Sequence, residues 1–107
     1  MKKIEAIVSP TKFEVVREGL KAAGIVGRLV VMPVCGLQRS SNPSLPGQKA
    51  DDELVRSIKI EVIVSDQLAR KAVNTVFDYM CSEKEEHAVG HITVLDIETT
   101  LPIGTDS

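Results

Sequence analysis

The sequence predicts an α+β domain in which four strands and two helices follow one another in the order βαββαβ. Two observations carry this prediction. Residues 3–8 and 57–64 alternate between two sets of side chains as strands do, and each is followed at once by a segment whose apolar residues recur at helical spacing. The chain of 107 residues has the length of one domain, so residues 1–107 are expected to share a single core.

The first strand–helix unit begins the chain. Ser9-Pro10 breaks the strand, and Thr11 with Glu14 then forms a capping-box pattern that predicts a helix starting near Lys12. Lys12 and the other charged residues of this helix are expected to point away from its apolar face. That face is predicted to contain Phe13, Val16, Leu20 and Ala23, and Gly24 supplies the stop.

A β-branched run from Arg28 to Cys35 predicts the second strand. Pro33 lies inside this run and has no amide hydrogen to donate, so the strand should lie at an edge of the sheet or contain a bulge. A segment rich in Ser, Asn, Pro and Gly follows at about residues 37–55 and has no apolar face to bury. Loops of this length are uncommon within compact domains and are either functional or disordered, so this flexible segment is the best single indication of activity in the sequence.

The second half of the chain repeats the strand–helix pattern. Residues 57–64 give the clearest strand, residues 66 to about 81 a helix, residues 90–97 a fourth strand and residues 98–107 a short tail. Two βαβ-like halves with right-handed crossovers produce a ferredoxin-like fold, a four-stranded antiparallel sheet with both helices on one face. The other face needs a cover, which self-association would provide.

Two segments carry a more specific pattern. Residues 1–27 contain a Lys-Lys-Ile-Glu-Ala-Ile strand, Pro10, the Lys12-Phe13 pair and a helix that ends in Gly24 to Gly27; residues 58–66 read IKIEVIVSD directly before the second helix. Both resemble the corresponding segments of the PII (P-II) nitrogen-regulatory signal transduction proteins. The chain is therefore similar to a divergent PII-like member, and its long loop lies where that family has its T-loop.

The resemblance also implies a ligand site. Before the loop the family has Lys-Gly-Phe-Gly-Arg-Gln, which Gly36 and Arg39 match and in which Ser40 replaces the glutamine. Gly90 matches the family's phosphate-binding B-loop, and His91 aligns with its phosphate lysine, although acidic residues at 85 and 86 disfavour an anion. The ligand-binding residues implied in this way are Ile7, Gly36, Leu37, Gln38, Arg39, Glu61, Ile63, Gly90 and His91.

By the same resemblance, the protein is expected to be a non-enzymatic homotrimer that needs no cofactor and senses ATP, ADP, AMP or another small anion in clefts between subunits. Its 37–55 loop would dock on a partner transporter or metabolic enzyme. One alternative is an interaction module of the same fold that has lost nucleotide binding. Another is a metal-responsive trimer that uses His87 and His91 with the acids of residues 83–86. The sequence itself shows neither a nucleophile with an identifiable base nor three ligands at metal-binding spacing.

The composition excludes several classes of partner. A net charge of −2 made of interspersed charges gives no basic face for nucleic acid. No stretch approaches the roughly 18 apolar residues of a membrane span, so a cytoplasmic protein without direct membrane insertion is expected. Cys35 and Cys81 lie far apart and outside any CxxC pattern, which indicates two ordinary thiols.

Overall fold

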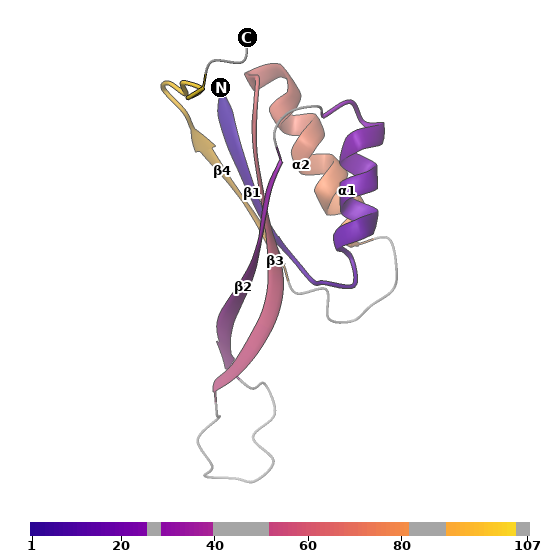
Figure 1. Ribbon diagram of the computed structural model, residues 1–107. Coiled ribbons are helices and arrows are strands. Elements are labelled where there is room, and N and C mark those ends of the chain that lie inside the picture. The colour runs from indigo at the N-terminus through magenta and orange to yellow at the C-terminus, as the bar shows by residue number, and fades with distance from the viewer. Residues whose placement is uncertain (26–28, 40–51, 82–89, 105–107) are drawn as a thin grey trace, which may run out of the picture.

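The computed structural model describes residues 1–25, 29–39, 52–81 and 90–104, and of residues 38, 39, 52 and 53 it describes the backbone alone. The elements confirm the predicted βαββαβ order (Figure 1). They are β1 (Lys2–Val8), α1 (Phe13–Ala22), β2 (Val30–Arg39), β3 (Asp52–Val64), α2 (Asp66–Met80) and β4 (His91–Asp96).

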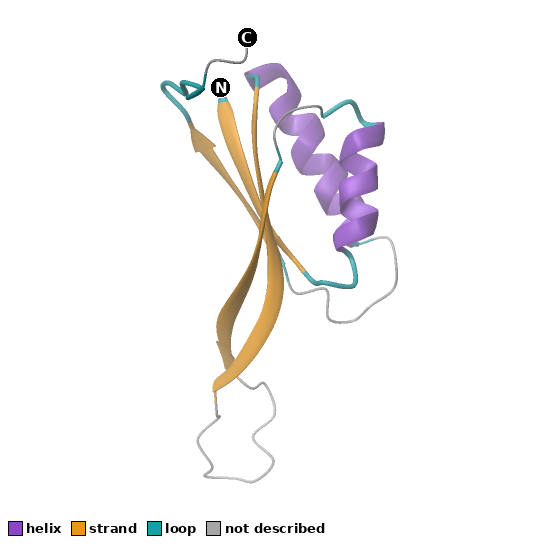
Figure 2. Cartoon of the chain, in the orientation of Figure 1, coloured by secondary structure: helices purple, strands orange, loops and turns teal. Residues whose placement is uncertain are grey.

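The four strands form one sheet in the order β2-β3-β1-β4, and each strand is antiparallel to its neighbours. Both helices pack on the same face of this sheet (Figure 2). The predicted ferredoxin-like fold is confirmed. β2 is an edge strand, and Pro33 within it is the register partner of Ile58. The edge position predicted for this proline, which has no amide hydrogen to donate, is therefore confirmed.

The core lies between the helices and one face of the sheet. Strand residues two apart point to the same side, so every second residue of β1 and β3 turns inward. These inward residues meet one face of each helix. The buried apolar side chains of the six elements are Ile4, Ala6, Val8, Val16, Leu20, Ile60, Val62, Val64, Ala69, Ala72, Val76 and Met80.

The start of α1 differs from its prediction. The helix begins at Phe13, the hydroxyls of Ser9 and Thr11 are hydrogen-bonded to each other at 3.0 Å, and Glu14 accepts a hydrogen bond from Arg17 at 2.7 Å. Thr11 and Glu14 are therefore engaged elsewhere, and the capping-box prediction was wrong. Lys12 is buried rather than turned to solvent, because its amide donates a hydrogen bond to the Ser9 carbonyl and it lies in the turn before α1, not on the outer face of the helix.

The β2–β3 hairpin is longer than the sequence predicted. Leu37 is the register partner of Leu54 and Arg39 that of Asp52, so residues 37–39 and 52–55 are strand and not loop. The pairing of β2 with β3 extends to Arg39 and Asp52 because the backbone groups of each strand are hydrogen-bonding partners for those of the other, and this holds even where no helix covers the two strands. The hairpin projects beyond the helices as an arm (Figure 1). The rest of the predicted loop, residues 40–51, lies outside the described residues.

Replacing Leu20 by alanine should lower the free energy of unfolding by about 2 to 5 kcal/mol, because its side chain is 1% exposed and its loss leaves a cavity in the core. Leu101→Ala is the matched control, since that leucine is 78% exposed. Denaturant titration followed by circular dichroism measures both. Equal losses in the two variants would contradict the placement of the core.

Candidate functional site

The sheet face opposite the helices carries most of the residues implicated by the sequence. Ile7 lies between its register partners Lys59 and His91, and Glu5 lies between Glu61 and Thr93. These side chains point away from the core because they alternate with the buried ones. We call this surface the open face. It comprises Lys3, Glu5, Ile7, Val30, Met32, Val34, Ser57, Lys59, Glu61, Ile63, His91, Thr93 and Leu95.

The first hollow on the open face lies at the base of the β2–β3 arm, and we call it the arm-side hollow. It has a volume of about 400 Å³ and brings together five of the predicted residues, which come from β1, β2 and the chain just before and within β4. Ser57 and Lys59 of β3 complete its polar wall. The lining residues are Ile7, Val34, Cys35, Gly36, Leu37, Val55, Ser57, Lys59, Gly90 and His91.

Gly90 has a structural reason to be a glycine in this hollow. A Cβ atom added there would lie 2.5 Å from the Ile7 carbonyl oxygen, which is closer than such atoms approach in folded proteins. The chain therefore enters β4 directly against the backbone of β1. This contact holds Ile7 and His91 side by side on the two paired strands.

The second hollow lies at the other end of the open face, beside the C-terminal tail, and we call it the tail-side hollow. It contains the other two predicted side chains, Glu61 and Ile63, together with Lys3, Val30 and the tail residues from Thr100 to Ile103. Its volume is about 770 Å³. Ile7 is the partner of Lys59, four residues before Ile63, so Ile7 and Ile63 lie about 13 Å apart along β3. One chain therefore does not bring all predicted residues together.

The remaining two predicted residues, Gln38 and Arg39, end strand β2, where they are the register partners of Glu53 and Asp52. Their side chains lie outside the described part of the structure. Their assignment to the ligand site stays a prediction, whereas their place in a strand rather than a loop is a finding.

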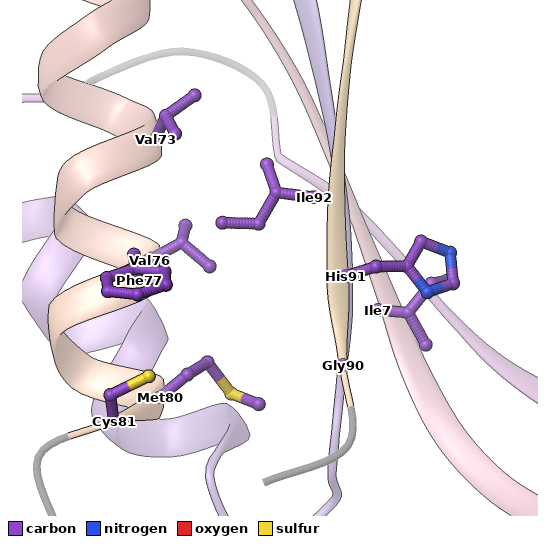
Figure 3. A pocket seen from close by; sticks show the side chains of 9 residues that line it. All are labelled: Ile7, Val73, Val76, Phe77, Met80, Cys81, Gly90, His91 and Ile92. Atoms are coloured by element: carbon purple, nitrogen blue, oxygen red, sulfur yellow. The ribbon is translucent and has the colours of Figure 1, made fainter.

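A third hollow of about 390 Å³ separates α2 from β4 on the helix side of the sheet. Figure 3 shows Ile92 pointing towards α2, whereas Ile7 and His91 point to the opposite side of the sheet. The α2 side chains that line this hollow are apolar, and the Cys81 thiol follows directly after the helix. The predicted residues Ile7, Gly90 and His91 also line it, but none of the lysines and glutamates of the open face does.

Four charged side chains form a closed set of ion pairs between the two hollows, and we call this set the charge square. Lys3 Nζ lies 3.2 Å from a Glu5 carboxylate oxygen and 3.4 Å from one of Glu61. Lys59 Nζ lies 3.0 Å from Glu61 and 3.8 Å from Glu5. Each side chain is 17–29% exposed. The two glutamates face each other in register, an arrangement that like charges disfavour, and the two lysines compensate for it.

The charge square shifts the pKa values of Lys3 and Glu61. Hydrogen bonds to Glu5 and then to Glu61 raise the pKa of Lys3 above its ordinary value. A hydrogen bond from Lys59 is the largest cause that lowers the pKa of Glu61, and Lys3 adds to it while partial desolvation opposes it. Both shifts favour the charged forms, so Lys3 is a cation and Glu61 an anion at neutral pH.

Lys3, Ser57 and Lys59 were missed as site residues from the sequence. The alternation of residues 57–63 did place Ser57, Lys59, Glu61 and Ile63 on one face, which was the available signal. The alternation alone does not give the register in which β1 pairs with β3. Without that register, Glu5 and Lys3 could not be recognised as the partners of Lys59 and Glu61.

Within the described ranges, no three His, Cys, Asp or Glu side chains lie close enough to hold a metal ion. His91 is placed in β4, whereas His87 and the acids of residues 83–86, invoked for a metal-responsive trimer, fall outside those ranges. Neither described helix has the length and apolarity needed to cross a membrane.

The whole chain, residues 1–107, matches the family described as nitrogen regulatory protein P-II. A protein of that name from Pyropia yezoensis is 34% identical over 107 residues, which cover 99% of this chain and 94% of the relative. The protein of the same name from Cereibacter sphaeroides is 31% identical over 106 residues. Nitrogen regulatory protein P-II 1 from Escherichia coli (strain K12) is 30% identical over 106 residues. Each of these two alignments covers 98% of this chain and 93% of the relative.

This chain belongs to the nitrogen regulatory protein P-II family. The resemblance found in residues 1–27 and 58–66 is confirmed and extends to the full length. P-II proteins are regulatory signalling proteins rather than enzymes, which agrees with a site of paired charges and apolar walls. In this P-II protein, the fold places seven of the expected ligand residues at two ends of one sheet face rather than in one hollow.

The pKa of the Glu61 carboxyl group should lie below 4.5, and Lys59→Met should raise it because the substitution removes the strongest partner of the carboxylate. Carboxyl carbon NMR shifts across a pH titration measure both values. The pKa of Glu61 is lower in the folded protein than in the unfolded chain. Its ion pairs therefore stabilise the fold at a pH above the pKa of the unfolded chain, and this stabilisation is lost as the pH falls through the pKa of the folded protein. Arg17→Met removes a cation from α1 and should leave Glu61 unchanged. A Glu61 pKa that is the same with and without Lys59 would refute the pairing.

Proposed function

We propose that this P-II protein is a cytoplasmic, non-enzymatic regulator that assembles as a homotrimer and binds an adenine nucleotide in clefts between subunits. Occupancy of the cleft would control a partner enzyme or transporter through residues 37–55, whose two ends form the β2–β3 arm. The observation that carries the proposal is the division of the expected ligand residues between two hollows at opposite ends of one open face.

That division supports a site shared between copies. Ile7 and Ile63 lie too far apart on one chain to contact the same ring, since a purine is shorter than the separation of about 13 Å along the strand. They can line one ligand if the arm-side hollow of one subunit faces the tail-side hollow of the next. In a closed trimer, each subunit would then contribute one hollow to each of two clefts.

The surface of the open face also favours assembly. Val30, Ile63 and Leu95 expose about two fifths of their area there, and the helices cover only the opposite face. The charge square between them is neutral overall, because two lysines and two glutamates compensate one another. A face with an apolar border and no net charge can be buried against another copy without leaving an unpaired charge.

The arm-side hollow has properties that suit a small effector. Its volume of about 400 Å³ falls within the usual range for small-molecule sites of about 300 to 1,000 Å³. Ile7 and Val34 provide an apolar wall, while Gly36, where an added Cβ would meet nothing within 4 Å, leaves the backbone open to close approach. Because Gly36 and Leu37 belong to the arm, a ligand here would favour one arrangement of the hairpin over others and so signal its presence.

A second candidate is a P-II protein that has lost nucleotide binding and acts only through its assembly and arm. The observation in its favour is that both lysines in the hollows already have carboxylate partners. The binding measurement below separates this candidate from the sensor.

Ile63→Asp should convert the trimer to monomers, because it places a charge in the apolar part of the open face. Size-exclusion chromatography with light scattering measures the mass directly. Val15→Asp is the control, since Val15 has similar exposure, 42% against 38%, but lies on α1. A wild-type protein that is monomeric at micromolar concentration would overturn the proposed assembly.

Adenine nucleotides should raise the melting temperature of the wild-type protein, because a ligand of the native state stabilises it. His91→Ala should reduce this rise by removing a side chain from the arm-side hollow. Thr93→Ala is the matched control, since Thr93 is the next outward residue on the same strand and lines neither hollow. A trimer whose melting temperature responds to none of these nucleotides would favour the interaction module instead.

A further inference from the structure

We propose that the regulated partner protein docks on the helix side of the β2–β3 hairpin, and that it meets this surface with an apolar groove bordered by a carboxylate group. This inference rests on the proposed function, because it names the surface and the chemistry by which the same partner would be held. The surface is a row of apolar side chains that α1 and α2 leave exposed.

Every second residue of β2 points to the helix side of the sheet. Val31 is the register partner of Ile60, which is buried beneath the helices, so Val31 and the residues two, four and six positions after it share that side. Leu54 of β3 joins them, because it is the register partner of Leu37. We call this row the β2 stripe. It consists of Val31, Pro33, Cys35, Leu37 and Leu54.

The helices cover β1 and the inner part of β3 but leave the β2 stripe open. Ile60 is 2% exposed, whereas its partner Val31 is 43% exposed. Leu37 and Leu54 lie where the hairpin projects beyond the helices (Figure 1), and they are 73% and 74% exposed. The stripe is about 20 Å long from Val31 to Leu37, since a strand rises by about 3.3 Å per residue. Contiguous apolar patches are uncommon on soluble proteins and mark surfaces where another molecule binds.

Pro33 limits how a partner can bind to this surface. β2 is an edge strand, and an edge strand can be extended by a strand of another protein through backbone hydrogen bonds. Pro33 has no amide hydrogen and would interrupt such a ladder within β2. A partner must therefore be held by its contacts with side chains, which requires an apolar surface of its own to bury the stripe.

Arg56 adds one positive charge beside the β2 stripe. It is the register partner of Cys35, its side chain is exposed, and it makes no ion pair or hydrogen bond with any residue that the structure describes. A guanidinium group binds a carboxylate through two parallel hydrogen bonds, so the complementary position on the partner calls for Asp or Glu.

A membrane surface is a poorer match than a protein. Recognition of anionic lipids takes a cluster of about four to eight Lys or Arg side chains. Arg56 is the one cation among the described side chains on the helix side of β2 and β3. The charge of this surface therefore suits a single carboxylate rather than a layer of phosphate groups.

The β2 stripe is also placed to respond to a ligand. Cys35 and Leu37 belong to the stripe and at the same time line the arm-side hollow, with Gly36 between them. A ligand that favours one arrangement of these three residues would change the centre of the stripe. By linkage, a docked partner would change the affinity for the ligand by the same factor.

Site-specific crosslinking in the native cells identifies the partner. A photoreactive benzoylphenylalanine replaces residue 54 of the full chain in one sample and residue 44 in another. Crosslinked proteins are identified by mass spectrometry, purified and titrated with the wild-type protein by calorimetry, and a protein counts as the partner only if it then binds. We expect a partner crosslinked at residue 54. A partner crosslinked at residue 44 alone would overturn the inference and leave the proposed function standing, whereas no partner at either position would overturn both.

Val31→Asp and Leu54→Asp test the β2 stripe with that purified partner. Each should raise the dissociation constant about tenfold or more, because it places a carboxylate in the apolar contact. Val15→Asp is the matched control and should leave the constant unaltered, since Val15 is 42% exposed against 43% for Val31 and lies on α1.

The Val31→Asp result is decisive, because Val31 lies outside residues 37–55 and lines none of the three hollows. This variant should keep the wild-type mass in light scattering and the wild-type rise in melting temperature with adenine nucleotides. A partner that binds Val31→Asp as tightly as the wild-type protein would overturn the inference while the proposed regulation through residues 37–55 stands.

Arg56→Glu tests the carboxylate and should weaken binding of the purified partner about tenfold or more, whereas Arg56→Lys should retain part of the affinity because it keeps the charge without the fork. Arg70→Glu makes the same charge reversal on α2 and should have no effect. Equal affinities in Arg56→Glu and the wild-type protein would refute the carboxylate. Cosedimentation with vesicles of equal parts phosphatidylcholine and phosphatidylglycerol tests the lipid alternative, and binding that Val31→Asp abolishes would overturn the protein partner.

Discussion

The pairing of β1 with β3 in one register produces both faces of the sheet. Ile4 opposite Val62 and Ala6 opposite Ile60 are buried beneath the helices. The intervening residues Lys3, Glu5 and Ile7 are therefore directed to the open face. Because side chains alternate along a strand, a slip of one residue would exchange these two sets and bury the charges under α1 and α2. Core packing and the composition of the candidate site are thus fixed by the same contact.

The charge square illustrates a compromise on that open face. A surface that is to be covered by other copies gains from apolar side chains, and Ile63, Val30 and Leu95 provide them. Charges in the same surface are tolerated when each has partners of opposite sign, and here every member of the square has two. Both lysines of the square are therefore engaged by carboxylates of the same chain.

The two ends of the open face serve different parts of the proposed mechanism. The arm-side hollow includes Gly36 and Leu37, so it lies where a ligand can influence the β2–β3 hairpin. The tail-side hollow includes Met1 and the tail residues from Thr100 to Ile103, so it lies at the end of the sheet where β1 begins. A site assembled from both would link the arm of one subunit to the tail of its neighbour, which suits a protein that reports occupancy to a partner.

Local patterns in the sequence were sufficient for the element order, the fold class and the family. Alternation in residues 3–8 and 57–64, helical spacing after each, and Pro33 at an edge strand all depend on interactions between near neighbours in the chain. The same patterns failed at the start of α1, where Ser9 competes for the Thr11 hydroxyl, and at the hairpin, where cross-strand hydrogen bonds extend β2 and β3 into the predicted loop. The grouping of Ile7 with Gly36 and His91, the separation of all three from Ile63, and the pairing of Lys3 with Glu61 and of Lys59 with Glu5 required the folded chain. These relations join residues more than 20 positions apart, and strand register, which no local pattern encodes, decides which of them meet.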